Sequence, residues 1–226
     1  MELLKELESN ILSYGASFAG FSFVKDHLSD ELKELEYAVT IGVRLSDFII
    51  DQIHNAPTYT YFHHYRMVNS LIDEITLKTG LLLQEKGYKY FPIAASQSVT
   101  HPTMEYCGVF PHKTAAVLSG LGWIGKSGLF INPDFGPRVR LGTVLTNAEL
   151  KRDNDVLKSR CGTCSICVES CPAQAIKGKN WSVGTERSDL IDAAVCSKYM
   201  MKKFGSIGRG SVCGICVKVC PFGKKE

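Results

Sequence analysis

Four cysteines lie close together in the second half of the chain, and their spacing is that of ligands for iron and sulfide. The run has the form C-x₂-C-x₂-C-x₃-C and comprises Cys161, Cys164, Cys167 and Cys171. Pro172 follows it directly. In two-cluster proteins such a run binds one [4Fe–4S] cluster with its first three cysteines, while the fourth binds the other cluster. We therefore predict two redox centres and a protein that handles electrons.

A second, incomplete run supplies further ligands: Cys213, Cys216 and Cys220, followed by Pro221. By the crossed rule, Cys220 completes the set that begins with Cys161, and Cys171 joins Cys213 and Cys216. That second set is one thiolate short, because Gly210 stands where a full run would begin. Two cysteines remain, Cys196 and Cys107. We favour Cys196 because it lies between the two runs, which leaves Cys107 over.

Other uses of cysteine fit this pattern less well. Disulfides require an oxidising compartment, but the N-terminal MELLKELESN favours an amphipathic helix rather than a signal peptide, and nine cysteines is an odd number. Structural zinc normally uses separated C-x₂-C pairs rather than four cysteines so close together. A radical-SAM cluster needs C-x₃-C-x₂-C, which neither run provides. We therefore expect iron–sulfur clusters and a cytoplasmic protein.

Composition argues against a membrane protein and gives no support to nucleic-acid binding. Of the 226 residues, 45% are hydrophobic, and no apolar stretch approaches the length of a membrane span. The formal net charge is +3, but two clusters bound by thiolates add negative charge that offsets it. We expect neither a membrane nor a nucleic acid as a partner.

The periodicity of hydrophobic residues divides the chain into two parts. Helices are expected at 3–12, near 29–36, from just after Pro57 to about Lys86, and at 112–118. Strands are expected at 19–24, 37–45, 88–94 and 140–146. The charged segment 149–160 is typical of a linker, and the residues after it are rich in cysteine and glycine. We predict the α+β class, with an α/β domain over 1–150 and a two-cluster, ferredoxin-like module over 151–226.

Residues 120–127, GLGWIGKS, match two nucleotide-binding motifs by letter. Gly120, Gly122 and Gly125 fit G-x-G-x-x-G, and Lys126 with Ser127 completes the P-loop pattern. Both motifs bind phosphate only where a strand leads into the loop and a helix leaves it. Here a helical pattern leads in, and the glycines and prolines of 128–137 prevent a long helix afterwards. We therefore do not expect nucleotide binding.

The same region resembles a known family. From His112 to Thr146 the sequence reads HKTAAVLSGLGWIGKSGLFINPDFGPRVRLGTVLT, and together with the cysteine runs it resembles the epoxyqueuosine reductases in a short form. These enzymes are in turn similar to the reductive dehalogenases, and the resemblance extends over residues 60–226. It implies a nitroreductase-like, cobalamin-binding N-terminal domain. It also implies that two clusters deliver electrons to the cobalt of that cofactor.

The resemblance carries the family's cluster ligands onto individual cysteines of this chain. The segment DAAVCSKY around Cys196 resembles the surroundings of the family's isolated ligand, which strengthens Cys196 over Cys107. The two implied ligand sets are Cys161, Cys164, Cys167 with Cys220, and Cys171, Cys196, Cys213 with Cys216.

Two features depart from the family. Where those reductases have an aspartate proton donor, this chain has Tyr106 and Cys107. Phenol and thiol can both donate a proton, but we interpret Tyr106 as a wall residue and Cys107 as a small buried hydrophobe. The helical-repeat domain that helps those enzymes hold tRNA has no counterpart in these residues. We therefore assign no catalytic residue and do not expect reduction of a tRNA nucleoside.

Three residues of the glycine-rich segment are candidates for cofactor binding. Trp123 either stacks on a planar cofactor or belongs to the core. Lys126 either meets an anionic group or is solvated, and Ser127 adjoins it. His63 and His64 lie on the expected long helix, and we assign them no role.

The function that we expect is electron relay. A low-potential donor such as a ferredoxin or flavodoxin reduces one cluster, and the second cluster reduces a corrinoid or small-molecule acceptor in the N-terminal domain. The alternative is an electron-transfer or corrinoid-reactivating protein of the ferredoxin type, whose acceptor belongs to another protein, such as a corrinoid protein. No residue pattern supports a third reading, a redox sensor.

Overall fold

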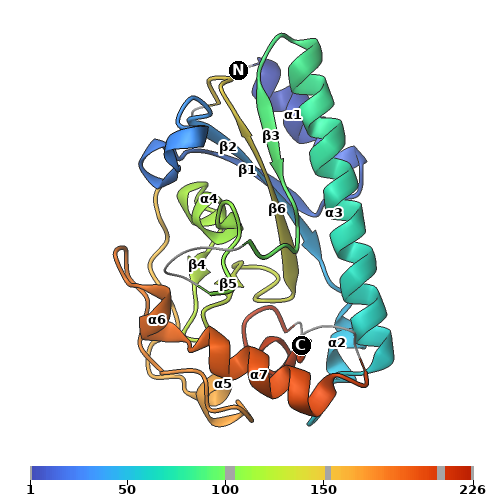
Figure 1. Cartoon of the computed structure of the whole chain (residues 1–226), viewed down its shortest axis with the longest axis vertical. Helices are drawn as coiled ribbons and strands as arrows, with labels where there is room; N and C mark the ends of the chain where they lie inside the picture. Colours follow the sequence, from blue (N-terminus) through green and yellow to red (C-terminus); the bar gives the residue numbers. More distant parts are fainter. Residues whose placement is uncertain (1, 100–104, 151–153, 208–211, 225–226) are drawn as a thin grey trace.

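A four-stranded antiparallel sheet organises the first part of the chain (Figure 1). The computed structural model describes residues 2–99, 105–150, 154–207 and 212–224. The strands of the sheet are β1 (Phe18–Phe23), β2 (Tyr37–Arg44), β3 (Tyr90–Ile93) and β6 (Val139–Thr146). Their order is β1-β2-β6-β3, and β2 is central to the pairing because Tyr37 faces Phe23 on one side and Thr146 on the other.

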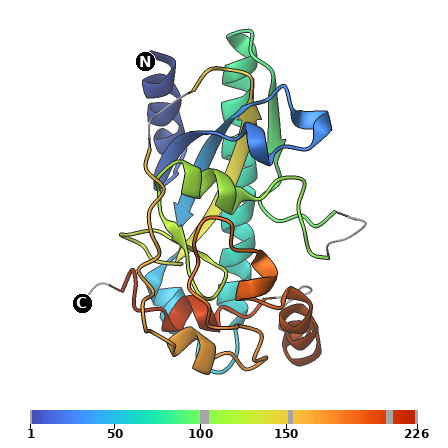
Figure 2. The same cartoon turned by 90° about the vertical axis from the view of Figure 1, so that its left-hand side faces the viewer.

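Helices cover both faces of this sheet. Helices α1 (Glu2–Ser13) and α3 (Tyr59–Glu85) pack on one face, and α4 (His112–Leu118) packs on the other (Figures 1 and 2). Successive side chains of β2 point to opposite faces of the sheet. Val39 and Ile41 join the core under α1 and α3, while Ala38 joins the core under α4. The side chain of Thr58 caps α3 by accepting a hydrogen bond of 3.0 Å from the amide of Tyr61.

The cysteine-containing segment forms the lower end of the molecule in Figure 1. The remaining elements are α2 (Asp47–Asp51), β4 (Trp123–Ile124), β5 (Phe130–Ile131), α5 (Ile166–Glu169), α6 (Arg187–Leu190), α7 (Ala193–Phe204) and α8 (Ile215–Val219). Helix α7 is capped by Asp192, whose carboxylate accepts from the amide of Val195 at 2.9 Å. After α7 the chain returns to the first part, where Val212, Ile215 and Val217 enter the same core as α1 and α3.

Most of the predicted elements are confirmed. The α+β class is observed, and the helices expected at 3–12, after Pro57 and at 112–118 are present, as are the four strands. The helix expected near 29–36 is wrong, because only a single 3₁₀ turn forms there (Asp30–Leu32). The described part of the expected linker packs against the sheet, since the side chain of Asn154 donates to the carbonyl of Phe21 at 3.1 Å.

The short β4–β5 hairpin was not foreseen, and it follows α4 in the glycine-rich segment. The division of the chain at residue 150 stays a prediction. Within the described residues, no helix has both the length and the apolar composition that crossing a membrane would require.

Candidate metal centre

The first group of cysteines surrounds a small cavity beside the β4–β5 hairpin. Its lining comprises Cys161, Cys164, Cys167 and Cys220, with Gly125, Lys126, Ser127, Ile131, Pro221 and Phe222. Burial, with a smaller contribution from the thiols of Cys161, Cys167 and Cys164, raises the pKa of Cys220 to about 11. Cysteines from both runs therefore face one site, although at least 52 other residues separate Cys220 from the first three.

The second group gathers cysteines from both runs and from α7. Burial raises the pKa of Cys216, and the nearby thiols of Cys213, Cys196 and Cys171 raise it further. Burial and the neighbouring Cys171 and Cys213 likewise raise the pKa of Cys196 to about 11. These four side chains belong to one neighbourhood, and the thiols there are costly to ionise without a cation to balance them. A metal centre supplies that balance, because metal binding displaces the protons of its thiol ligands.

The two groups are neighbours. The thiol of Cys167, in the first group, also contributes to the raised pKa of Cys216 in the second. Helices α5 and α8, which carry these two cysteines, are in contact. An electron on a cluster at the first site therefore has only a short path to a cluster at the second.

The composition of the two donor sets favours a cluster over a single ion. Within the described residues, no three His, Cys, Asp or Glu side chains are close enough to hold one metal ion. A zinc ion holds its thiolates at about 2.3 Å, which draws four sulfurs tightly together. A [4Fe–4S] cluster binds one thiolate on each of four irons and so spreads its ligands more widely. The all-thiolate donor sets and their spacing fit clusters better than structural zinc.

Close packing at each group explains why glycine stands near the cysteines. Gly214 precedes α8 with φ of +80°, and a Cβ atom there would lie 2.7 Å from atoms of Ile53 and Tyr61. Only glycine adopts this left-handed conformation without strain and leaves the space free. Gly125 plays a similar part at the first site, where a Cβ atom would lie 2.9 Å from Ile131 and 3.6 Å from the sulfur of Cys161.

Lys126 is part of the first site rather than of the solvated surface. Its side chain is 7% exposed, and Nζ donates a hydrogen bond of 2.9 Å to the carbonyl of Cys164. Ser127 is also buried and lines the same cavity. The two residues thus face the first group of cysteines, and the solvated alternative for Lys126 is wrong.

Trp123 is completely buried, which agrees with the core alternative and not with stacking on a large planar cofactor. Its ring contacts Phe222 edge-on with centroids 5.1 Å apart, and the guanidinium of Arg160 lies 5.4 Å from the ring centroid. Its indole nitrogen has no hydrogen-bond partner within the described residues. Trp123 therefore packs behind the cysteine loop.

The structure gives the glycine-rich segment a packing role. Helix α4 leads into it and the β4–β5 hairpin follows, the reverse of what phosphate binding requires. A Cβ atom on Gly122 would lie 2.1 Å from the carbonyl oxygen of Ile131. The segment thus needs glycine so that the hairpin can close.

The candidate proton donors lie in a separate loop. Tyr106 is 39% exposed, and its carbonyl accepts a hydrogen bond of 2.8 Å from Arg187. Cys107 pairs through its backbone with Val99 and belongs to neither group of cysteines. On α3, His64 accepts a hydrogen bond of 3.0 Å from the amide of Ser46. The interpretations of Tyr106 and Cys107 stay predictions.

A polar network next to the second group was missed by sequence reasoning. The guanidinium of Arg140 lies 4.4 Å from the ring centroid of Tyr65, and its Nε donates to Asn69 at 2.9 Å. The hydroxyl of Tyr65 is 3.3 Å from that of Ser96. Tyr61, which touches Gly214, is 6.4 Å from Tyr65 between ring centroids. Each residue looked ordinary in its own helix or strand, so no local signal marked the network.

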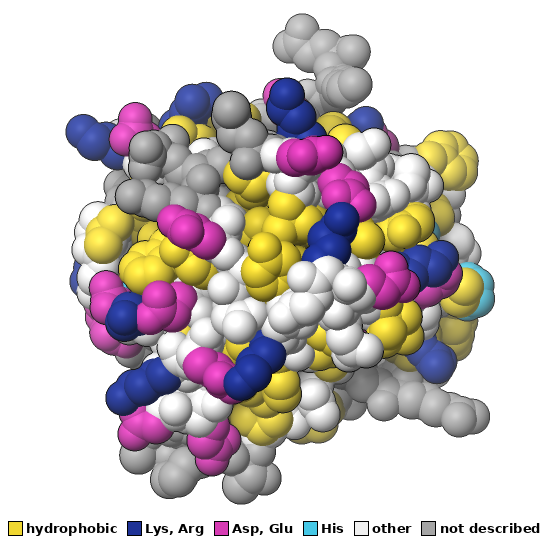
Figure 3. Space-filling model, turned by 90° about the horizontal axis from the view of Figure 1, so that it is seen from above, with side chains coloured by type: hydrophobic (Ala, Val, Ile, Leu, Met, Phe, Trp, Pro, Cys, Tyr) yellow, Lys and Arg dark blue, Asp and Glu magenta, His cyan; other side chains and the backbone are white. Residues whose placement is uncertain are grey.

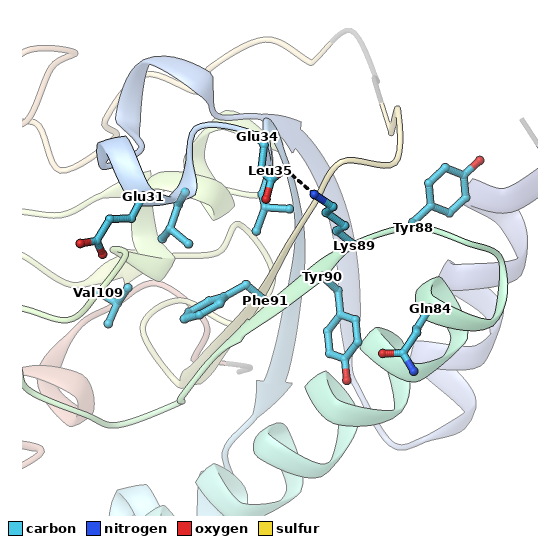
Figure 4. A pocket seen from close by; sticks show the side chains of 10 residues that line it. Glu31, Glu34, Leu35, Gln84, Tyr88, Lys89, Tyr90, Phe91 and Val109 are labelled. Atoms are coloured by element: carbon cyan, nitrogen blue, oxygen red, sulfur yellow. Dashed lines mark hydrogen bonds and ion pairs between the residues drawn. The ribbon is translucent and has the colours of Figure 1, made fainter.

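An open hollow elsewhere has no part in this centre. It lies at the outer edge of β3, where Phe91 and Val109 face it and the ion pair of Lys89 with Glu34, 2.7 Å long, stands at its side (Figure 4). None of its lining residues is a cysteine.

Comparison with known proteins agrees with this geometry. Residues 160–223 match the family model of the 4Fe-4S double cluster binding domain. The epoxyqueuosine reductase of Synechocystis sp. is 32% identical over 127 residues, which cover 52% of this chain and 41% of the relative. A tetrachloroethene reductive dehalogenase of Desulfitobacterium hafniense is 30% identical over 162 residues, which cover 68% of this chain and 27% of that protein. The chain is related to the epoxyqueuosine reductases and the reductive dehalogenases.

Solved structures of both groups share the fold of this chain. The catabolic reductive dehalogenase NpRdhA superimposes with a TM-score of 0.78 at 19% identity, over 97% of this chain and 31% of that one. The epoxyqueuosine reductase from Streptococcus thermophilus gives a TM-score of 0.64 at 18% identity, over 100% of this chain and 67% of that one. The chain thus spans less than half the length of the two curated relatives. It is an iron–sulfur redox protein with two [4Fe–4S] clusters.

Proposed function

We propose that this protein relays electrons from a low-potential carrier, through its two clusters, to an acceptor held against its N-terminal part. The proposed ligands of the first cluster are Cys161, Cys164, Cys167 and Cys220. Those of the second cluster are Cys171, Cys196, Cys213 and Cys216. The proposed donor is a ferredoxin or flavodoxin, and we expect the protein to work in the cytoplasm.

One observation supports the proposed direction of electron transfer between the two clusters. The loop of the second group is fixed against α3 and the segment that follows α2, because Gly214 lies next to Tyr61 and Ile53. The loop of the first group lies at the surface, where Gly162, Thr163 and Ile166 are exposed. An electron that arrives at the surface therefore reaches the first cluster before the second. In this proposal the second cluster then reduces the acceptor in the N-terminal part.

We propose a corrinoid as that acceptor, in a nitroreductase-like domain. One solved reductive dehalogenase with this fold is described as carrying out B12-dependent dehalogenation. In this chain, the network of Tyr65, Asn69, Ser96 and Arg140 beside the second group offers donors and acceptors that fit the amide groups at the rim of a corrin. When bound, the corrinoid would supply reductive chemistry at cobalt, while these residues would hold and orient it.

Corrinoid retention tests the proposal. The protein is reconstituted anaerobically with iron and sulfide, mixed with hydroxocobalamin and desalted, and its visible spectrum is then recorded. One retained corrinoid per chain, beside the broad cluster absorption, supports an acceptor in the N-terminal part. Clusters without any corrinoid would move the acceptor to another protein and favour the corrinoid-reactivating alternative.

A further inference from the structure

Charge is distributed very unequally between the two parts of the chain. Residues 151–226 contain 14 Lys and Arg against 7 Asp and Glu, whereas residues 1–150 contain 12 against 16. The end of the molecule farthest from the cysteines shows basic and acidic side chains interspersed, with no continuous patch of one sign (Figure 3). The basic excess therefore belongs to the part that holds the clusters.

Several of these cations border the exposed loop of the first group. Lys158 and Arg160 are exposed and lie within three residues of Cys161 in sequence. On the other side of the loop, the side chain of Asn180 donates to the carbonyl of Gly162 at 3.1 Å, so the segment with the exposed Lys177 runs alongside. We call this surface the docking face: Gly162, Ile166 and Pro221 at its centre, with Lys158, Arg160 and Lys177 around them.

The centre of the docking face is apolar and lies over the first cluster site. Ile166 is 43% exposed although it sits between the ligand candidates Cys164 and Cys167. Pro221 is exposed and follows Cys220. The corresponding residues near the second group, Ile215 and Val217, are 6% and 8% exposed. The first site thus combines an apolar contact patch with surrounding cations.

We propose that the docking face binds a small acidic electron-carrier protein, which deepens the proposed function by naming where its donor binds. The basic rim attracts and orients an acidic partner, while the apolar centre allows close approach. The step transfers one electron: the carrier is oxidised by one electron, the first cluster is reduced by one, and no bond or proton moves. Complementary charge raises the rate of encounter, and salt weakens it.

Protein is favoured over RNA as the partner. Strong nucleic-acid binding rests on many phosphate contacts, of the order of 6–10, and an apolar centre contributes nothing to them. The rim provides three cations around Ile166 and Pro221, which suits a compact acidic protein surface better.

Stopped-flow reduction of the reconstituted protein tests this face. A reduced acidic ferredoxin and a flavodoxin hydroquinone serve as donors, and the rate constant of cluster reduction is followed at increasing NaCl concentration. For the double variant Lys158→Glu and Lys177→Glu, the rate constant at low salt should fall about tenfold, and the salt dependence should flatten. The matched control is Lys203→Glu, near the far end of α7, which makes a similar exposed charge change and should alter the rate less than twofold.

Reduced methyl viologen separates this proposal from the relay itself. This small reductant needs no docking face. The rate at which it reduces each cluster should therefore be the same in every variant as in the unmodified protein. Carrier rates that are equal in the double variant and the unmodified protein would overturn the docking face and leave the relay intact. Failure of viologen to reduce the second cluster would instead overturn the relay. Loss of affinity for a tRNA stem-loop in the double variant, with carrier rates unchanged, would assign the face to RNA and overturn the proposal.

Discussion

The ring of Tyr61 lies directly against the backbone of Gly214, so that a Cβ atom at Gly214 would be 2.7 Å from Cε1 of Tyr61. Tyr61 belongs to the first turn of α3, and Gly214 lies between Cys213 and α8. This contact joins the longest helix of the N-terminal part to the loop of the second group. It makes the position of the second cluster dependent on the helix that also supports the sheet.

Replacing Gly214 with alanine should therefore damage the second site specifically. The left-handed φ costs a residue with a side chain about 1–2 kcal/mol, and the methyl group would displace Ile53 or Tyr61. Iron analysis and electron paramagnetic resonance should show partial loss of the second cluster. Gly162→Ala is the matched control: its φ is also positive, but a Cβ atom there meets nothing within 4 Å. Equal iron loss in both variants would contradict the role of the Tyr61 contact.

Cys196→Ala should remove one cluster and spare the other. Cys196 lies near Cys171 and Cys213 but belongs to a different helix from both runs, so its loss should lower the iron content by about four per chain. Cys107→Ala should keep the full iron content, since Cys107 lies outside both groups. Full iron retention in the Cys196 variant would exclude Cys196 as a ligand.

Lys126→Met should make the first cluster more sensitive to air. The substitution keeps an unbranched apolar stem, one atom shorter than lysine, but removes the hydrogen bond of 2.9 Å to the carbonyl of Cys164. A hydrogen bond of this charged kind contributes about 1.5–3 kcal/mol. The measurement is the decay of visible cluster absorption after exposure to oxygen.

Calorimetry of the unmodified protein with ATP should show no binding, and tight binding would contradict the packing role assigned to the glycine-rich segment.

His112 should make the stability of the protein depend on pH. Its Nε2 donates to the carbonyl of Ala94 at 3.1 Å, and in the neutral ring its Nδ1 accepts from the hydroxyl of Thr143 at 2.9 Å. Burial lowers the pKa of His112 from 6.5 to about 4. Below pH 6.5 the imidazole of His112 is therefore protonated in the unfolded chain but stays neutral in the folded chain. The free energy of unfolding falls as the pH decreases towards 4.

Urea unfolding at about pH 7.5 and 5.5 measures this effect. The free energy of unfolding should fall by about 1.4 kcal/mol over this interval because of His112. His112→Gln should be less stable at neutral pH, since it loses the paired hydrogen bonds, but this part of the pH dependence should vanish. His27→Gln, at an exposed position, should keep the full slope. An unchanged slope in the His112 variant would show that other groups cause it.

Local signals in the sequence predicted the elements well where a pattern was long. Helix α3 begins after Pro57 and ends before Gly87, because proline suits the start of a helix and glycine its exit. The helix expected near 29–36 is not formed, and only the 3₁₀ turn Asp30–Leu32 is present, because a helix of so few residues gains little from its own hydrogen bonds. The grouping of the cysteines follows the crossed rule, with Cys196 beside Cys213 and Cys216.

Tertiary contacts could not be predicted from local patterns in the sequence. The sequence offered Trp123 as a stacking residue, yet packing against Phe222 buries it completely. The network around Arg140 joins α3, β6 and the loop after β3, which are distant in sequence. Such a site has no motif, because each residue follows the ordinary pattern of its own element and only the fold brings them together.

The shared core has a consequence for how the protein responds to iron supply. Val212, Ile215 and Val217 pack with α1 and α3, yet they lie in the segment that carries Cys213 and Cys216. Chains that have not yet received iron must therefore complete their central core with a loop whose ligands are unbound. The sheet and the clusters would then mature together, and shortage of iron would reduce the amount of folded protein as well as its redox capacity.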